Sequence, residues 1–186
     1  KHVQLFCMQT DQDAQRIKEL GATFSKVHTL GNLKFDIDIA CDQITRKFLG
    51  LGKHDQIIVG GSTHPGEEEI LIQHYLRHVA DNPNVRLILA PRHVERSDQV
   101  CDLVEKNNLH ARRYSELSRK PLLSSDVLVV DEIGHLRQLY HLANVVFIGK
   151  TLTVGGGQNM IEPVFCNKPT IVGPMTQNFK DVVDIF

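Results

Sequence analysis

The sequence lacks the cysteine spacing that a zinc cluster or a disulfide framework requires. Its four cysteines, Cys7, Cys41, Cys101 and Cys166, lie far apart, and no two of them form a Cys-x-x-Cys pair. Reduced thiols in a cytosolic setting are the default for such a pattern. We therefore expect neither a disulfide nor a cysteine-bound metal ion.

Long apolar runs and an excess of one charge are also missing. No run approaches the ~18 apolar residues of a membrane-spanning helix, and the first residues show no signal-peptide pattern. The formal net charge of −1 gives no reason to expect nucleic acid or an anionic membrane surface as a partner. A length of 186 residues supports one domain and part of a second.

Two well-known nucleotide-binding loops are absent as well. Gly149-Lys150-Thr151 looks like the end of a P-loop, but that motif needs a glycine where Asn144 stands. The glycines from Gly155 to Gly157 fail the dinucleotide fingerprint, because Met160 occupies the third glycine position. Neither an ATPase loop nor a nicotinamide loop is predicted.

The sequence does contain a regular alternation of strands and helices from about Asp36 onward. Short apolar runs typical of buried strands occur at 56–60, 85–90, 127–130 and 145–149, with helical spacing between them. Strands alternating with helices predict an α/β fold with a doubly wound, Rossmann-like parallel sheet. In such sheets, ligands bind beyond the carboxyl ends of the strands.

Polar blocks follow these strands directly, where a ligand would bind. Arg92 follows one strand, and its guanidinium suits a phosphate or a pyrimidine carbonyl. Asn159 and Glu162 lie three apart, so both reach the same side of a helix. Hydroxyls and backbone N–H groups at Ser62, Thr63, Gly156 and Gly157 suit a phosphate pocket.

Each of these residues also has an ordinary interpretation. A strand-end arginine is often only solvated, and a glycine loop can be a mobile surface loop with Glu162 as a solvated acid of the first helical turn. Ser62-Thr63-His64 lacks the G-x-S-x-G elbow of a nucleophile. His74 and His78 are four apart, but Tyr75 occupies the glutamate position of a zinc motif.

The blocks together carry a resemblance to a known family. Gly-Gly-Gln-Asn-Met-Ile-Glu-Pro followed by Lys-Pro-Thr-Ile-Val-Gly-Pro resembles the donor-sugar signature of two-domain GT-B glycosyltransferases. More narrowly, it resembles the 3-deoxy-D-manno-octulosonic acid (Kdo) transferases, which load Kdo from CMP-Kdo onto lipid A. Four further blocks, at 31–36, 61–64, 90–93 and 131–136, lie in the family's order.

The resemblance implies a division of the chain and a set of functional residues. Residues 1–35 would be the end of the N-terminal acceptor domain and the linker, and residues 36–186 the C-terminal CMP-Kdo-binding domain. Lys34 would stabilise charge in the transition state, without cofactor or metal. CMP would be held by Pro91, Arg92, Ile133, Gly134, His135, Asn159, Met160, Ile161 and Glu162.

The sequence departs from the family at two of these blocks. The family usually has an acid where His135 stands, so a role for this side chain does not carry over, although backbone contacts would survive. The residue before Asn159 is more often a histidine, and Gln158 replaces it here with another hydrogen-bonding group.

The resemblance also implies what the whole protein does. The reaction would be inverting transfer of Kdo from CMP-Kdo to a lipid A precursor in lipopolysaccharide core biosynthesis, at the cytoplasmic face of the bacterial inner membrane. The family places its glutamate base and its membrane anchor in the N-terminal half, which we expect this chain to lack. We therefore expect no transfer by these 186 residues alone.

Two alternatives stay open at this point. The chain could belong to another GT-B enzyme, such as a UDP-sugar transferase or a nucleotide-sugar 2-epimerase. It could also be a non-catalytic α/β module that only binds a nucleotide. Nucleotide preference would distinguish the first alternative from a Kdo transferase. Turnover by the full-length protein would distinguish the second.

Overall fold

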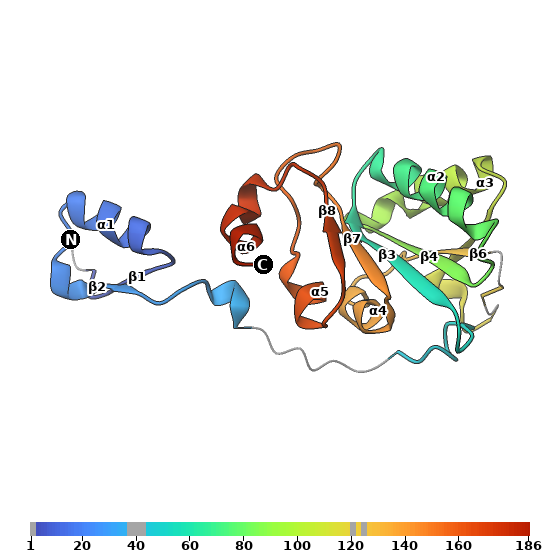
Figure 1. Cartoon of the computed structure of the whole chain (residues 1–186), viewed down its shortest axis with the longest axis horizontal. Helices are drawn as coiled ribbons and strands as arrows, with labels where there is room; N and C mark the ends of the chain where they lie inside the picture. The colour runs from blue at the N-terminus through green and yellow to red at the C-terminus, as the bar shows by residue number, and fades with distance from the viewer. Residues whose placement is uncertain (1–2, 37–43, 120–121, 124–125) are drawn as a thin grey trace. The chain divides into compact units, whose positions relative to one another are not determined.

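The chain divides into two compact units in a computed structural model that describes residues 3–36, 44–119, 122–123 and 126–186. Unit 1 comprises Lys1–Asp38 and unit 2 comprises Ile39–Phe186 (Figure 1). The assignment of residues 1–35 to an acceptor domain and its linker stays a prediction. Of the four cysteines, Cys7, Cys101 and Cys166 are free thiols, and Cys41 lies outside the described residues.

Unit 1 is a small strand–helix–strand motif. Strand β1 (Phe6–Met8) and strand β2 (Val27–Thr29) pair in parallel, and helix α1 (Asp11–Glu19) connects them. The helix begins after Thr10, whose hydroxyl accepts a hydrogen bond from the Asp13 backbone N–H at 3.1 Å. A 3₁₀ turn over Leu33–Phe35 follows.

Unit 2 contains a six-stranded parallel sheet with the strand order β5-β6-β4-β3-β7-β8. The order places β3 and β4 in the middle and β5 and β8 at the edges, so the prediction of a doubly wound parallel sheet is confirmed. Because the strands are parallel, all their carboxyl ends lie at the same end of the sheet. The strands are β3 (Gln56–Thr63), β4 (Val85–Pro91), β5 (His110–Arg113), β6 (Asp126–Val129), β7 (Val145–Ile148) and β8 (Thr170–Val172).

Helices cover both faces of this sheet. Helices α2 (Glu67–Val79) and α3 (Ser97–Lys106) lie on one face, and α4 (Leu136–Leu142) and α5 (Ile161–Phe165) lie on the other (Figure 1). Apolar side chains of α2 and α3, including Ile72 and Val104, pack against alternate residues of β4 and β6. Helix α6 (Lys180–Ile185) ends the chain.

The carboxyl end of β3 has an irregular backbone that shapes the site. Gly61 pairs with Ala90 and Thr63 with Pro91, so Ser62 is an extra residue in a bulge, with φ +53°. A Cβ atom on Gly149 would lie only 2.1 Å from the Ser62 carbonyl oxygen. Glycine at position 149 therefore lets the end of β7 approach the bulge closely.

Candidate functional site

The carboxyl ends of the central strands enclose a cavity of about 200 Å³, which we call the strand-end hollow. It brings together predicted site residues from three strands that are far apart in the sequence. Ser62 comes from β3, Pro91 is the last residue of β4 and Arg92 follows it, and Ile133 and Gly134 belong to the loop after β6. The full lining is Ser62, Ala90, Pro91, Arg92, Val94, Val130, Glu132, Ile133, Gly134 and Leu136.

A second hollow of about 280 Å³ shares Gly134 and Leu136 with the first and adds Glu162 from α5. The Glu162 carboxylate accepts hydrogen bonds from Asn159 Nδ2 at 3.2 Å and from Arg137 Nη2 at 3.4 Å. The predicted proximity of Asn159 and Glu162 is therefore confirmed. Arg137 was missed, because a lone arginine in a short helix carries no pattern of its own.

Met160 and Ile161 differ from their neighbours in being almost fully buried. Their exposed fractions are 3% and 0%, so both side chains belong to the core rather than to a solvent-facing surface. The Ile161 backbone N–H donates to Asn159 Oδ1 at 3.1 Å. Their predicted contact with CMP stays a prediction, and the burial restricts it to backbone atoms.

The residues predicted to form a phosphate pocket mostly use their polar groups within the protein. The Gly156 N–H donates to the Met175 carbonyl and to Gln177 Oε1, and the Gly157 N–H donates to the Lys150 carbonyl. The Thr63 hydroxyl is buried and donates to Glu68. These contacts give no support to a phosphate pocket at Thr63, Gly156 or Gly157. Ser62, in contrast, lines the strand-end hollow.

His135 lies beside the strand-end hollow within a chain of polar and aromatic contacts. Its ring stacks on Tyr114 with 4.2 Å between the centroids, and its Nε2 lies 3.1 Å from Glu132 Oε2. Its Nδ1 lies 3.4 Å from Gln138 Oε1. Burial raises the pKa of the Tyr114 hydroxyl, and the negative charge of Glu132 raises it further.

Two acids in the first turn of α2, Glu67 and Glu68, are buried. The Glu67 carboxylate is fully buried and accepts four backbone N–H bonds, one from His64 and three from residues 150–152, at 2.8 to 3.0 Å. Glu68 accepts from the Thr63 hydroxyl and from Arg96. Glu67 thus joins the start of α2 to the loop after β7.

His64 lies between Gln158 and His93 at the same sheet edge. Gln158 Nε2 is 3.2 Å from His64 Nε2, and the rings of His64 and His93 meet edge-on at 5.8 Å. Burial lowers the pKa of His64, Glu67 opposes this effect, and the positive neighbours His93, Lys150 and Arg96 lower the pKa further. A neutral imidazole can accept the Gln158 N–H at Nε2.

Lys34, the residue predicted to act in the transition state, lies in unit 1. Its backbone N–H donates to Asn32 Oδ1 at 2.9 Å, within the 3₁₀ turn. No structural observation tests its catalytic role, so that role stays a prediction.

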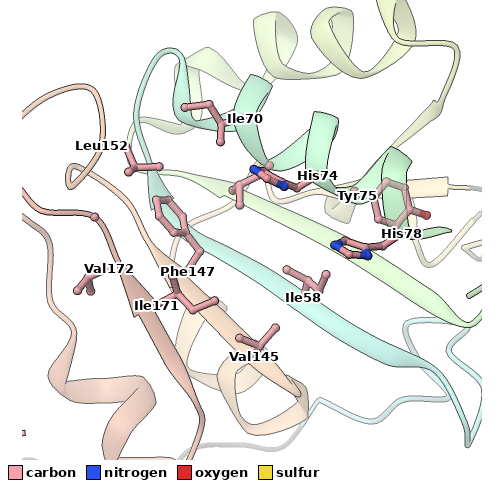
Figure 2. A pocket seen from close by; sticks show the side chains of 12 residues that line it. Ile58, Ile70, His74, Tyr75, His78, Val145, Phe147, Leu152, Ile171 and Val172 are labelled. Carbon is pink, nitrogen blue, oxygen red and sulfur yellow. The ribbon is translucent and has the colours of Figure 1, made fainter.

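A larger cavity of about 360 Å³ lies elsewhere, between α2 and strands β7 and β8. Figure 2 shows apolar side chains, among them Ile58, Phe147 and Ile171, along its length, with His74 and His78 on the helix side. A ligand site needs polar groups that converge on one point. This apolar groove is on a face of the sheet, so we assign the candidate site to the carboxyl ends.

Neither a metal centre nor a membrane span emerges from the described residues. In residues 3–36, 44–119, 122–123 and 126–186, no three His, Cys, Asp or Glu side chains are grouped so that they could hold a metal ion. None of the helices in this part of the chain is both long enough and apolar enough to cross a membrane.

Comparison with known proteins identifies relatives for both units. Residues 1–37 match the family model described as 3-Deoxy-D-manno-octulosonic-acid transferase (kdotransferase). A bifunctional glycosyltransferase/methyltransferase of Fusobacterium nucleatum is 38% identical over 97% of the chain. The 3-deoxy-D-manno-octulosonic acid transferase of Aquifex aeolicus is 33% identical over 98%.

The chain spans 28% and 47% of the lengths of these two curated relatives. A solved structure, the C-terminal CMP-Kdo binding domain of WaaA from Acinetobacter baumannii, is 32% identical with a TM-score of 0.68. The match covers 75% of this chain and 72% of that domain. The fold, the identity and this coverage agree, so the chain belongs to the Kdo transferase family.

Proposed function

We propose that unit 2 binds CMP-Kdo and forms the donor side of an inverting glycosyltransferase that transfers Kdo to a lipid A precursor in lipopolysaccharide biosynthesis. The observation that carries this proposal is the strand-end hollow, which gathers Ser62, Arg92 and Gly134 from three strands beside Glu162. The relative that is a CMP-Kdo binding domain supports the same ligand.

The charges around the two hollows suit a nucleoside monophosphate. Arg92 is exposed at the mouth of the strand-end hollow and offers a planar set of N–H donors for a phosphate or a carbonyl oxygen. The Glu162 carboxylate, already bonded by Asn159 and Arg137, suits ribose hydroxyls as donors. CMP is the leaving group, so groups that stabilise its phosphate lower the barrier to transfer.

The acceptor, the membrane and the compartment complete the proposal for the whole protein. The acceptor is a lipid A precursor, and the reaction takes place at the cytoplasmic face of the bacterial inner membrane. Transfer needs a general base for the acceptor hydroxyl, which we assign to a glutamate of the acceptor domain. Lys34 of unit 1 supplies positive charge as the transition state develops.

Calorimetric titration of the 186-residue chain with CMP, UMP, AMP and NAD tests the donor assignment. CMP should bind most tightly, and NAD should not bind, because the sequence fails the dinucleotide fingerprint. Tighter binding of UMP would favour a UDP-sugar enzyme, and equal or tighter binding of AMP or NAD would refute the proposal.

An arginine pair provides a matched control. Arg92→Ala should weaken CMP binding about tenfold, because a charge-assisted hydrogen bond is lost. Arg77→Ala removes another exposed arginine, which belongs to α2 and lines neither hollow, and should leave the affinity unchanged.

A further inference from the structure

Two adjacent acids follow strand β6, and only one of them faces the strand-end hollow. Asp131 accepts hydrogen bonds from the Ser115 backbone N–H at 3.0 Å and from the Ser115 hydroxyl at 2.6 Å, so it fixes the 3₁₀ turn (Tyr114–Glu116) that follows β5. Glu132 lines the hollow together with Arg92, and its side chain is 47% exposed. The hollow therefore contains both a carboxylate and a guanidinium.

His135 holds the Glu132 carboxylate in place. The imidazole Nε2 contacts Glu132 Oε2 at 3.1 Å, while Gln138 lies beside the other ring nitrogen and Tyr114 stacks on the ring. Contacts on the face of the ring and at both nitrogens leave it little freedom to rotate. A carboxylate can accept about four hydrogen bonds, so the contact with His135 leaves acceptor capacity toward the hollow.

The two charged groups match the edge of cytosine and not that of uracil. Cytosine presents an exocyclic amino donor at C4, and a carboxylate is a preferred acceptor for that group. Uracil presents an oxygen at the same position, which a carboxylate repels. The guanidinium of Arg92 suits the ring carbonyl that both bases share.

We propose that Glu132 selects cytosine over uracil by accepting a hydrogen bond from the exocyclic amino group of the base, with His135 as its positioning residue. This inference rests on the proposed donor function, because it places the base of CMP in the strand-end hollow. The position where the family usually carries an acid is His135, and the acid lies three residues earlier in this chain.

Calorimetry on the Glu132→Gln variant of the full 186-residue chain tests the proposal. The CMP dissociation constant should rise about tenfold, since a hydrogen bond to a charged acceptor is lost. UMP should bind equally well or more tightly, because an amide can also donate to the uracil oxygen. The ratio of the UMP to the CMP dissociation constant should therefore fall about tenfold or more.

Glu116→Gln is the matched control. Its side chain is 46% exposed and lies 3.9 Å from Arg112, so it is also a half-exposed acid beside a basic group, but it does not line the hollow. This variant should keep the affinities of the unsubstituted chain for both nucleotides.

A change in the ligand gives an independent test that needs no protein variant. The pyrimidin-2-one analogue of CMP lacks the amino group and adds no oxygen in its place. It should bind the unsubstituted chain about as weakly as CMP binds Glu132→Gln, and Glu132→Gln should weaken it no further. Full affinity of this analogue for the unsubstituted chain would overturn the inference even if the variant failed to fold.

The variant His135→Gln separates positioning from a merely structural role. It should lower the preference for CMP over UMP, whereas a structural role would weaken both nucleotides equally. An unchanged ratio in Glu132→Gln, or an equal loss of both nucleotides, refutes the selection of cytosine and leaves the donor function standing. Failure of the unsubstituted chain to bind CMP refutes the donor function itself.

Discussion

Replacing Glu67 by glutamine should destabilise unit 2 strongly, although the two side chains have nearly the same size. The Glu67 side chain is fully buried, and each carboxylate oxygen accepts two backbone N–H bonds. Oε2 accepts from His64 and Lys150, both at 2.8 Å, and Oε1 accepts from Thr151 and Leu152 at 2.9 and 3.0 Å. A carboxamide can present an oxygen to only one of these pairs.

The loss of stability comes from the pair of backbone N–H groups that the amide oxygen does not reach. Two backbone N–H groups would face the NH₂ group of the glutamine, and each buried donor without an acceptor costs about 1–3 kcal/mol. The central estimate is therefore about 4 kcal/mol, a large part of the ~5–15 kcal/mol that stabilises a typical domain. In a chain of this size the melting temperature should fall by roughly 10 °C.

Urea denaturation measures this loss as a change in the free energy of unfolding. The control is Glu69→Gln, which alters an exposed acid in the same turn of α2 and should stay within about 0.5 kcal/mol of the unsubstituted chain. A loss of less than about 1 kcal/mol for Glu67→Gln would show that the four hydrogen bonds do not hold the loop after β7, and the reasoning would fail.

Three further predictions concern other positions. Gly149→Ala should lower the free energy of unfolding by about 3 kcal/mol, because the new Cβ meets the Ser62 carbonyl. The control Gly155→Ala should have little effect. Equal denaturation midpoints for the two variants would contradict this prediction. Glu162→Gln should weaken CMP binding about tenfold and lower the free energy of unfolding by less than about 1 kcal/mol. A large drop in melting temperature with unchanged affinity would show that Glu162 has a structural role. In the full-length protein, Lys34→Ala should lower kcat more than it weakens donor binding, and steady-state kinetics with equal losses would argue against a transition-state role.

The general arrangement of unit 2 was predictable because it depends on local patterns. Apolar runs such as 85–90 mark buried strands, and helical spacing between them fixes the α/β class. The carboxyl ends of parallel strands necessarily meet at one edge. Gathering Ser62, Arg92 and Gly134 around one hollow follows from that rule, and the structure confirms it.

The buried acids were not predicted, because their partners are distant in the sequence. Three glutamates after Gly66 look like first-turn acids that favour the helix dipole, but Glu67 binds N–H groups more than 80 residues away. For Glu68 a local signal did exist. The positions 68, 72 and 75 share a helical face, and burial of Ile72 and Tyr75 implies that Glu68 also points inward.

Strand β8 forms one edge of the sheet with only three residues, and Ile171 within it is 56% exposed. Edge segments with few buried contacts open more often than central strands, so its backbone amides should exchange with solvent faster than those of β3 and β4. The chain between β7 and β8 carries Glu162. A nucleotide that bridges Arg92 and Glu162 would restrain this chain segment through Glu162, and hydrogen exchange in β8 should slow on binding although no residue of β8 lines either hollow. Occupancy of the site is thus readable as protection at a distant edge of the sheet.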